Sequence, residues 1–411
     1  MTQVIIVGAG PAGSVLASLL AQRSIESLLL DRATFPREKI CGDYLSPGTL
    51  RLLDQLNLLG EVQVAGARRL WGMTVTAPDG TTFRAEYPAT SQENGAHPFA
   101  LSIPRAKLDT LLLEQARRWG VKCLEAFRVT DLIWTGGRVR GVTGIGPHGR
   151  ESYRGQVVVG ADGRGSVVAR RLGLHRPHPT LHRMALVAYY EGASELRDHG
   201  AISVGDGSYC ILNPVGDGLI NTSIVMDQTK LLPWKGHLEE LFDVTLAAFP
   251  RTANDLRAAR RTGPIRCLGP LAFRASQTSM AGALLIGDAA GFYDPFTGEG
   301  VYHALWSANL AAREIAGALT NGGMTPPRLN RFDRGQRKAL AVKHRLCAAL
   351  QAVISRPAAA NALARLLRRR QPLADLLLGV IGDLLPPRAL LSIRALKPPS
   401  AIIRGASWNN T

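Results

Sequence analysis

The first 31 residues combine two short, mainly apolar runs with a segment of helical spacing. Val4–Val7 and Ser27–Leu30 have the length and composition of buried parallel strands, and Val15–Ala21 between them fits a helix. This pattern predicts a strand–helix–strand unit. Two later runs, Val157–Val159 and Ala283–Ile286, are also apolar and predict further buried strands of the same kind.

Other segments alternate apolar and polar residues and predict antiparallel strands. Residues 70–88 alternate on both sides of Asp79-Gly80, which is a hairpin signal, and residues 180–262 contain more such runs with a helix expected near His237–Ala248. From Leu329 onwards, Leu and Ala recur at helical spacing. We therefore expect an α/β fold with three parts: a discontinuous nucleotide-binding domain (1–70, 99–175 and 265–325), an antiparallel substrate-binding β-sheet domain (71–98 and 176–264) and a helical region (326–411).

Charge adds a feature at the C-terminal end. The chain has 411 residues and a net charge of +17, and residues 331–411 carry 15 Lys or Arg against three acids, or +12 of that excess. A basic amphipathic region can contact an anionic membrane surface, nucleic acid or a charged protein, or it can dock on its own protein. We expect no nucleic-acid partner and keep peripheral contact with an anionic membrane open.

The cysteines and the apolar segments exclude several other classes. The five cysteines are odd in number, widely spaced and free of a CxxC motif, so neither a zinc site nor a disulfide framework is indicated, and no metal is expected. A strand begins almost at the first residue, which does not fit a signal peptide. Acids and prolines interrupt the apolar stretch Leu373–Leu391, which argues against a membrane span. We expect a cytoplasmic protein, at most peripheral to the membrane.

The first turn carries a Gly-x-Gly-x-x-Gly motif, and an acidic residue follows at the end of the second strand. Gly8 permits a tight turn, Gly10 lets the backbone approach a pyrophosphate, and Gly13 lets the helix pack close to the strand. Ala12 lies in the same turn, beside the helix N-terminus that favours phosphate. Asp31, 23 residues after Gly8, can accept hydrogen bonds from an adenosine ribose. The motif predicts a dinucleotide site.

Two later motifs end strands in the same way. Asp162 lies in the segment Gly160-Ala161-Asp162-Gly163, which follows a predicted strand. There its carboxylate can accept a hydrogen bond from a ligand or from a helix end. Asp288 follows another, where a carboxylate can bind a polyol, and the loop from Pro295 leads to a helix expected near Val301. Because NAD sites are usually finished within one half of such a fold, a polyol site some 280 residues after the first motif favours FAD.

In this order and spacing, the three motifs resemble those of FAD proteins with a glutathione-reductase-type nucleotide fold, over about residues 1–320. The group includes aromatic hydroxylases, flavin halogenases, lycopene cyclases and geranylgeranyl reductases. "PREKICGDYLSP" (36–47) and "GDAAGFYDPFTGEGVYHAL" (287–305) are similar to the geranylgeranyl reductase family. That resemblance implies FAD contacts through the backbones of Cys41, Gly42 and Val129, through Arg105 at the phosphates or ribose, through Asp288 at the ribityl chain, and through the amides of Gly300 and Val301 at the isoalloxazine. The expected cofactor site also includes Arg32, Asp162 and Pro295.

Two departures bear on the reaction. The halogenase signature Trp-x-Trp-x-Ile-Pro is missing, which argues against halogenation. The reductases often carry Tyr-x-Trp-x-Phe-Pro in the substrate sheet; here Tyr209 and Pro214 are kept, but Ile211 and Asn213 stand where the aromatic residues would be. This departure weakens the case for an isoprenoid substrate, whereas the prediction of FAD as cofactor is unaffected.

Three functions follow from these observations. The first is an FAD-dependent oxidoreductase that passes a hydride to or from a hydrophobic substrate, isoprenoid, lipid-like or natural-product in type, with NAD(P)H as the expected electron donor. The second is a monooxygenase that uses NAD(P)H and O2, and the third is a non-catalytic FAD-stabilised scaffold. No side chain is compelled as acid or base: Tyr44, Tyr293 and His303 are candidates only by their position near flavin motifs, and Cys41 is either a reactive thiol or a small packed residue.

Overall fold

The computed structural model describes residues 2–89, 97–193, 198–320 and 323–391. Each expected domain includes residues outside these ranges, and the helical region includes residues 392–411. The last three basic residues of the tail, Arg394, Lys397 and Arg404, also lie outside the described residues.

A six-stranded sheet carries the three glycine–acid motifs at the ends of its strands. Its strands, in spatial order, are β20 (Ser279–Met280), β21 (Ala283–Leu285), β12 (Val157–Gly160), β1 (Val4–Val7), β2 (Ser27–Leu30) and β8 (Lys122–Leu124). All neighbouring pairs are parallel except β20 and β21. The strands predicted from apolar runs are thereby confirmed, and their carboxyl ends lie along one edge of the sheet.

Both faces of this sheet are covered, which explains why its strands lack a polar side. Val4 and Ile6 pack in one core with helices α1 (Pro11–Ala21), α4 (Arg105–Arg118) and α9 (Gly300–Thr320). Ile5 and Val7 pack in a second core with the sheet β9–β11 and with helix α5. The bounds of these last elements are β9 (Arg128–Thr135), β10 (Arg138–Gly146), β11 (Gly149–Arg154) and α5 (Val167–Arg171). Helix α1 begins at Pro11, four residues before the predicted start, because proline suits the first helical position.

A seven-stranded sheet forms the second layer. In spatial order it contains β18 (Arg260–Leu268), β14 (Arg183–Glu191), β17 (Leu219–Asp227), β16 (Tyr209–Pro214), β15 (His199–Val204), β5 (Gly72–Thr76) and β6 (Thr82–Glu86). The predicted hairpin around Asp79-Gly80 is confirmed as β5–β6. The prediction of a wholly antiparallel sheet is wrong at one pair, because β5 and β15 are parallel. These two strands are far apart in sequence, so no tight turn forces them to run in opposite directions.

Smaller elements connect these layers and cover their edges. Two three-stranded sheets are formed by β3 (Tyr44–Leu45), β7 (Ala100–Ser102) and β4 (Arg68–Leu70), and by β13 (His175–Pro177), β19 (Phe273–Ala275) and β22 (Gly291–Phe292). The short helices are α2 (Pro47–Gln55), α3 (Leu59–Val64), α6 (Gln228–Leu231), α7 (Leu238–Ala247) and α8 (Pro250–Asp255). Helices α7 and α8 pack on one face of the seven-stranded sheet, which leaves its other face toward the cofactor motifs.

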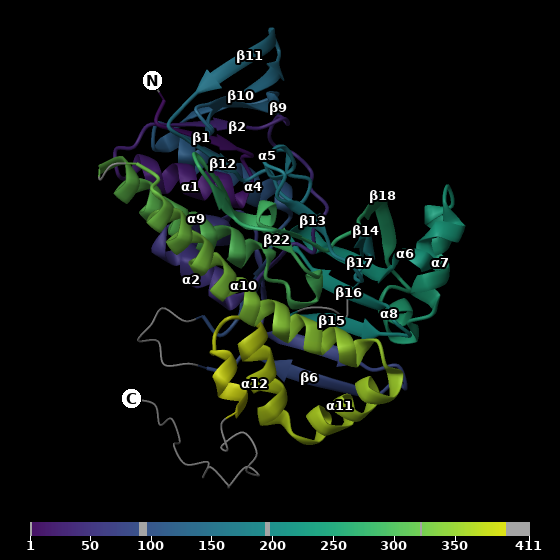
Figure 1. Ribbon diagram of the computed structural model, residues 1–411. Helices are drawn as coiled ribbons and strands as arrows, with labels where there is room; N and C mark the ends of the chain where they lie inside the picture. Colours follow the sequence, from purple (N-terminus) through teal and green to yellow (C-terminus); the bar gives the residue numbers. More distant parts are fainter. Residues whose placement is uncertain (1, 90–96, 194–197, 321–322, 392–411) are drawn as a thin grey trace, which may run out of the picture.

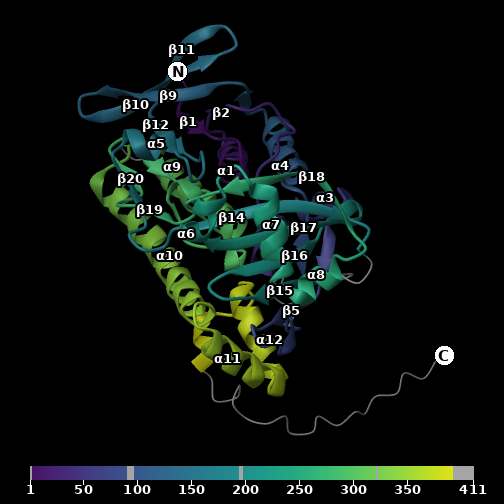
Figure 2. The same cartoon turned by 90° about the vertical axis from the view of Figure 1, so that its right-hand side faces the viewer.

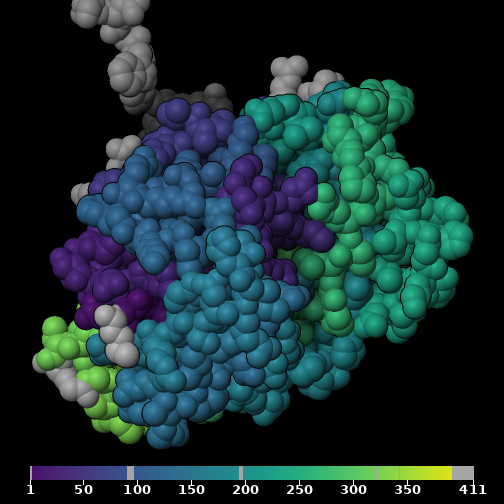
Figure 3. Space-filling model, turned by 90° about the horizontal axis from the view of Figure 1, so that it is seen from above, coloured from purple at the N-terminus to yellow at the C-terminus, as the bar shows by residue number. Residues whose placement is uncertain are grey.

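Three helices follow the last motif. The long helix α10 (Pro326–Ile354) runs from beside α9 to the far end of the molecule, and α11 (Pro357–Arg369) and α12 (Gln371–Ile381) fold back against β6 (Figures 1 and 2). From the side of β9–β11, part of the purple N-terminal region lies between the blue region and the green segments, although these are distant in sequence (Figure 3). Within the described ranges, no helix has both the length and the apolar character needed to cross a membrane.

Candidate active site

One cavity of about 1110 Å³ runs from the strand ends of the six-stranded sheet to the C-terminal helices. It brings together 14 of the 15 residues predicted from the sequence. Those that line it are Gly8, Gly10, Ala12, Asp31, Arg32, Cys41, Gly42, Arg105, Val129, Asp162, Asp288, Pro295, Gly300 and Val301. The remaining residue, Gly13, does not line the cavity. Because the other residues line one cavity, the separate sequence motifs form one site.

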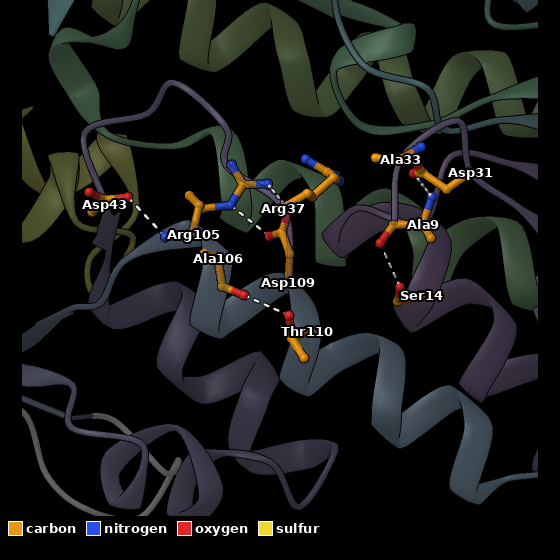
Figure 4. A network of polar contacts seen from close by, with 10 residues as sticks. All are labelled: Ala9, Ser14, Asp31, Ala33, Arg37, Asp43, Arg105, Ala106, Asp109 and Thr110. Carbon is orange, nitrogen blue, oxygen red and sulfur yellow. Dashed lines mark hydrogen bonds and ion pairs between the residues drawn. The ribbon is translucent and has the colours of Figure 1, made fainter. Parts of the chain in front are cut away.

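The first turn has the geometry that its glycines predict. Gly8 has φ +104°, and a Cβ there would lie 2.5 Å from the carbonyl oxygen of Ala161. A Cβ on Gly13 would overlap the carbonyl oxygen of Gly8, so this glycine allows α1 to pack directly against the turn. Asp31 fixes the turn from the neighbouring strand, because its Oδ2 accepts from the Ala9 amide at 2.7 Å (Figure 4). At Gly10, where a phosphate would approach, a Cβ would come into van der Waals contact with the guanidinium of Arg37.

Asp162 has one oxygen occupied and one available. Its Oδ2 accepts from the Val167 amide at 2.7 Å, at the start of α5. Its Oδ1 is buried and receives no hydrogen bond from any described residue. Burial raises the pKa of this carboxyl, although the hydrogen bonds oppose the rise. Asp162 therefore serves the helix end and also leaves an acceptor for a ligand.

A cluster of cations stands beside the first turn (Figure 4). Arg105 forms a bidentate pair with the fully buried Asp109, with N–O distances of 2.7 and 2.8 Å, and Arg37 contacts the same carboxylate at 3.1 Å. Burial lowers the pKa of Arg105, but the neighbouring Asp109 carboxylate raises it by more, so the guanidinium stays charged. Two cations thus share one anion.

Arg37 and Lys39 extend this cluster into the cavity. Nη2 of Arg37 lies 3.4 Å from where a Cβ on Gly10 would be, and its Nε is buried without a partner among the described residues. The Lys39 ammonium lies 3.2 Å from the corresponding position on Gly163. Burial and the nearby Arg105 lower the pKa of Lys39, which an anionic ligand would counteract. Surplus positive charge and an orphaned donor at this turn fit a pyrophosphate group.

The segment Cys41–Gly42 is held by two asparagines of the seven-stranded sheet. Nδ2 of Asn221 donates to the carbonyl oxygen of Cys41, and Nδ2 of Asn213 donates to that of Gly42, each at 2.7 Å. Sequence reasoning missed both asparagines. At Asn213 the sequence shows only the replacement of an aromatic residue, and no local pattern marks Asn221.

Asp43 follows this segment and connects the two layers. Its Oδ1 accepts from the amide of Arg105 at 3.1 Å, while its Oδ2 accepts from the Tyr189 hydroxyl at 2.5 Å and from Nδ2 of Asn221 at 2.8 Å. The side chain is buried, and burial raises its pKa to about 6 against the effect of these three donors. Asp43 thus fixes the cofactor-facing segment to both α4 and the sheet.

Of the three candidate acid–base residues, only Tyr44 faces the cavity. Its hydroxyl hydrogen-bonds to that of Tyr87, which also lines the cavity, and burial raises the pKa of both. Tyr293 instead lies between the rings of His178 and His344. His303 is hydrogen-bonded to Gln336 at 3.1 Å, behind the wall.

The far half of the cavity is apolar. The seven-stranded sheet contributes Val75, Phe83, Val187, Ile202, Val204, Ile211 and Val225, and α10 contributes Leu350, Val353 and Ile354. Helix α11 contributes Ala360, Leu363, Ala364 and Leu367, and α12 contributes Ala374, Leu377, Leu378 and Ile381. Each of these two sets follows the i, i+3, i+4, i+7 pattern of one helix face. The amphipathic C-terminal helices therefore turn their apolar faces into the cavity.

Residues 1–342 match the family model described as FAD binding domain. The chain belongs to this family. Its cofactor is FAD, and like the members of the family it is an FAD-dependent oxidoreductase enzyme. The glycine turn at Gly10, the unpartnered atoms Nε of Arg37 and Oδ1 of Asp162, and the cationic cluster fit that cofactor, and these residues would hold it. In the described part of the chain, no group of three or more His, Cys, Asp or Glu side chains is placed to bind a metal ion.

The curated relatives include both reductases and halogenases. The chain is 30% identical to a menaquinone reductase of Mycolicibacterium smegmatis over 337 residues, which cover 78% of this chain and 77% of that protein. It is 24% identical to a 1H-pyrrole-2-carbonyl-[peptidyl-carrier protein] chlorinase of Pseudomonas fluorescens, covering 80% and 79%. It is 27% identical to a digeranylgeranylglycerophospholipid reductase of Methanococcoides burtonii, covering 80% and 78%.

Solved structures support the fold and not the branch. The myxobacterial chondrochloren halogenase CndH matches 96% of this chain and 99% of its own at 24% identity, with a TM-score of 0.81. The flavin-dependent halogenase CmlS matches with a TM-score of 0.78, but the chain spans only 63% of it. The expected membership of the wider FAD superfamily is confirmed. The narrower assignment to the geranylgeranyl reductases is one of several branches that the relatives represent.

Proposed function

We propose that this flavoprotein transfers a hydride between FAD and a hydrophobic substrate bound in the apolar half of the cavity. One observation carries the proposal: the cavity that begins at the predicted cofactor residues continues without a break into a chamber with aliphatic walls on the sheet and on α10, α11 and α12. Aliphatic walls of this extent favour an apolar ligand, since each buried methylene adds about 0.8 kcal/mol. The reductase relatives support the same class of substrate.

The residues of the chain bind, orient and exclude water, while FAD, when bound, supplies the redox chemistry. The first turn, Arg37 and Lys39 would hold the pyrophosphate, and Asp288 the ribityl chain. Gly300 and Val301 begin α9, so their amides present the positive end of a helix to negative charge. Tyr44 and Tyr87 line the cavity with hydrogen-bonded hydroxyl groups, which would hold a proton at its wall.

Oxygen-dependent chemistry is the second candidate, favoured by the halogenases among the relatives and the solved structures. The two are separated by mixing the protein, reduced anaerobically with NADPH, with menaquinone in detergent micelles, and repeating the reaction under ¹⁸O₂. Our proposal predicts flavin reoxidation without O2 and a product that gains two hydrogens and no ¹⁸O. Reoxidation only with O2, or a product that contains ¹⁸O, would reject it in favour of the second candidate. Reduction by NADPH in the first step tests the proposed electron donor.

Peripheral contact with an anionic membrane is also proposed, through the outer side of α11. Arg356 precedes α11 and Arg368 and Arg369 end it, all three are exposed, and Leu366 of the same helix is 46% exposed. An apolar substrate dissolved in a membrane would then lie next to the helices that close the chamber. Co-sedimentation with phosphatidylglycerol vesicles should fall at least threefold for the variant Arg368→Glu/Arg369→Glu at low salt. Binding that is unchanged, or equal on neutral vesicles, would contradict this contact.

A further inference from the structure

The side chain of Asn213 is buried in the wall of the cavity with an unused acceptor. Asn213 is 1% exposed and lines the cavity from β16. Its Nδ2 donates to the carbonyl oxygen of Gly42 at 2.7 Å and to Oγ of Ser102 at 2.8 Å. Its Oδ1 is buried, and no donor among the described residues reaches it.

The orientation of this amide is fixed by its partners. The carbonyl oxygen of Gly42 can only accept, and the Ser102 hydroxyl already donates its hydrogen to the carbonyl oxygen of Asp43 at 3.0 Å. Both partners therefore require the NH2 group of Asn213, and a flipped amide would place oxygen against oxygen. Oδ1 must lie on the other side.

The neighbouring asparagine provides a comparison. Asn221 is the register partner of Asn213 on β17 and also has an NH2 group that holds the segment at Cys41. In contrast to Asn213, its Oδ1 accepts from the Ser223 hydroxyl at 2.8 Å. Two adjacent asparagines with the same structural task thus differ in one respect, since only Asn213 keeps a free acceptor. A buried polar atom of this kind normally has a partner, so the partner of Asn213 is expected to be a ligand.

The surroundings of Oδ1 define the ligand. On the same side of the sheet, Ile211, Val187 and Val225 line the cavity with aliphatic groups, and the hydroxyl of Ser223, which also lines it, already donates to Asn221. We propose that Asn213 is a specificity-determining residue that accepts a hydrogen bond from an O–H or N–H group of an otherwise apolar substrate. This inference rests on the proposed function insofar as it takes the apolar half of the cavity as the substrate site. It narrows the substrate class from apolar compounds in general to those with a hydrogen-bond donor, such as phenols, alcohols or pyrrole-like N–H compounds. Menaquinone, which has no such donor, then serves as a probe of hydride transfer and not as the expected substrate.

The test compares two probes on the FAD-loaded protein. 1-Naphthol carries a donor, and 1-methoxynaphthalene has the same ring system without one. Their dissociation constants are measured from the perturbation of the flavin absorbance on titration. Wild-type protein should bind 1-naphthol at least tenfold more tightly, because a site with an unpaired acceptor discriminates against a ligand that leaves it unpaired. Equal affinities would overturn the proposal without any variant.

Two variants assign the discrimination to Asn213. In Asn213→Ala the preference for 1-naphthol should fall to less than threefold, whereas Ile211→Ala, two residues along the same strand face, should weaken both probes alike. A preference that survives in Asn213→Ala would overturn the assignment. So would a loss of FAD affinity in Asn213→Ala without a change in the ratio, since the acceptor would then serve the cofactor. None of these results depends on turnover, so the hydride-transfer proposal stands or falls separately in the menaquinone experiment.

Discussion

The change Asp43→Asn tests whether the carboxyl of Asp43 connects the two layers as a buried, easily protonated group. In the wild type its two oxygens accept hydrogen bonds from the backbone amide of Arg105, the hydroxyl of Tyr189 and the side-chain amide of Asn221. Asparagine has nearly the same shape and cannot titrate. The difference in unfolding free energy between wild type and variant therefore isolates the ionisation of this one group.

The sign and size of the pH effect follow from the raised pKa. Burial raises the pKa of Asp43 from its usual 3.8 to about 6. Between these values the folded state binds more protons than the unfolded state, so the contribution of Asp43 to stability is full below pH 3.8 and is lost as the pH rises through 6. The complete change corresponds to about 3 kcal/mol, of which about 2 kcal/mol falls between pH 4.5 and 7.5.

The assay is urea denaturation of both FAD-loaded proteins at pH 4.5, 6.0 and 7.5, followed by far-UV circular dichroism. The stability of the wild type relative to Asp43→Asn should decrease by about 2 kcal/mol across this range. The Tyr189→Phe change removes a donor that favours the carboxylate, so it should destabilise the protein more at pH 7.5 than at pH 4.5, and only while Asp43 is present. A difference that stays constant or grows with pH would refute the raised pKa.

Three other predictions concern the cofactor and the chamber. Gly13→Val should abolish FAD retention after gel filtration because its side chain would overlap the carbonyl of Gly8, whereas Gly60→Ala, where a Cβ meets nothing within 4 Å, should retain FAD. Lys39→Met should raise the dissociation constant of FAD about tenfold or more by removing a charge at the phosphate turn, and FAD binding equal to wild type would contradict that role. Ala364→Phe should fill part of the chamber and weaken menaquinone binding at least fivefold with FAD affinity unchanged, while Leu366→Phe on the exposed side of α11 should bind as the wild type does.

Local sequence determines the parts of this fold that were predicted correctly. The strands β1, β12 and β21 are short apolar runs because both faces of their sheet are covered, and that burial leaves a mark on each segment alone. The hairpin β5–β6 is marked by its own turn. The parallel pairing of β5 with β15 has no local mark, since it depends on which sheet edge a distant hairpin reaches. The position of a strand can thus be predicted from nearby residues, whereas the direction in which two distant strands pair depends on long-range contacts.

The candidate site divides in the same way. Gly8, Gly13 and Asp162 were found from the sequence because turn geometry and strand ends restrict residue type within a few positions. The pairing of Arg37 with Asp109 and the contact between Asn213 and Gly42 join segments that are distant in sequence, and no spacing rule predicts them. Asn213 is instructive because the sequence marked the position but read it only as a missing aromatic ring. Its meaning depends on the two acceptors that orient it.

The apolar faces of α11 and α12 illustrate why a helical pattern alone does not identify what a helix packs against. Leu and Ala at i, i+3, i+4 and i+7 with arginines on the other side suit both a membrane surface and a docked helix. In the structure these apolar faces are directed into the cavity, so they are already used as chamber walls. The proposed membrane contact therefore depends on the exposed arginines and on Leu366, which the chamber does not use. It follows that a membrane would be bound mainly by charge, and that raising the salt concentration should release the protein while leaving the chamber and its ligand in place.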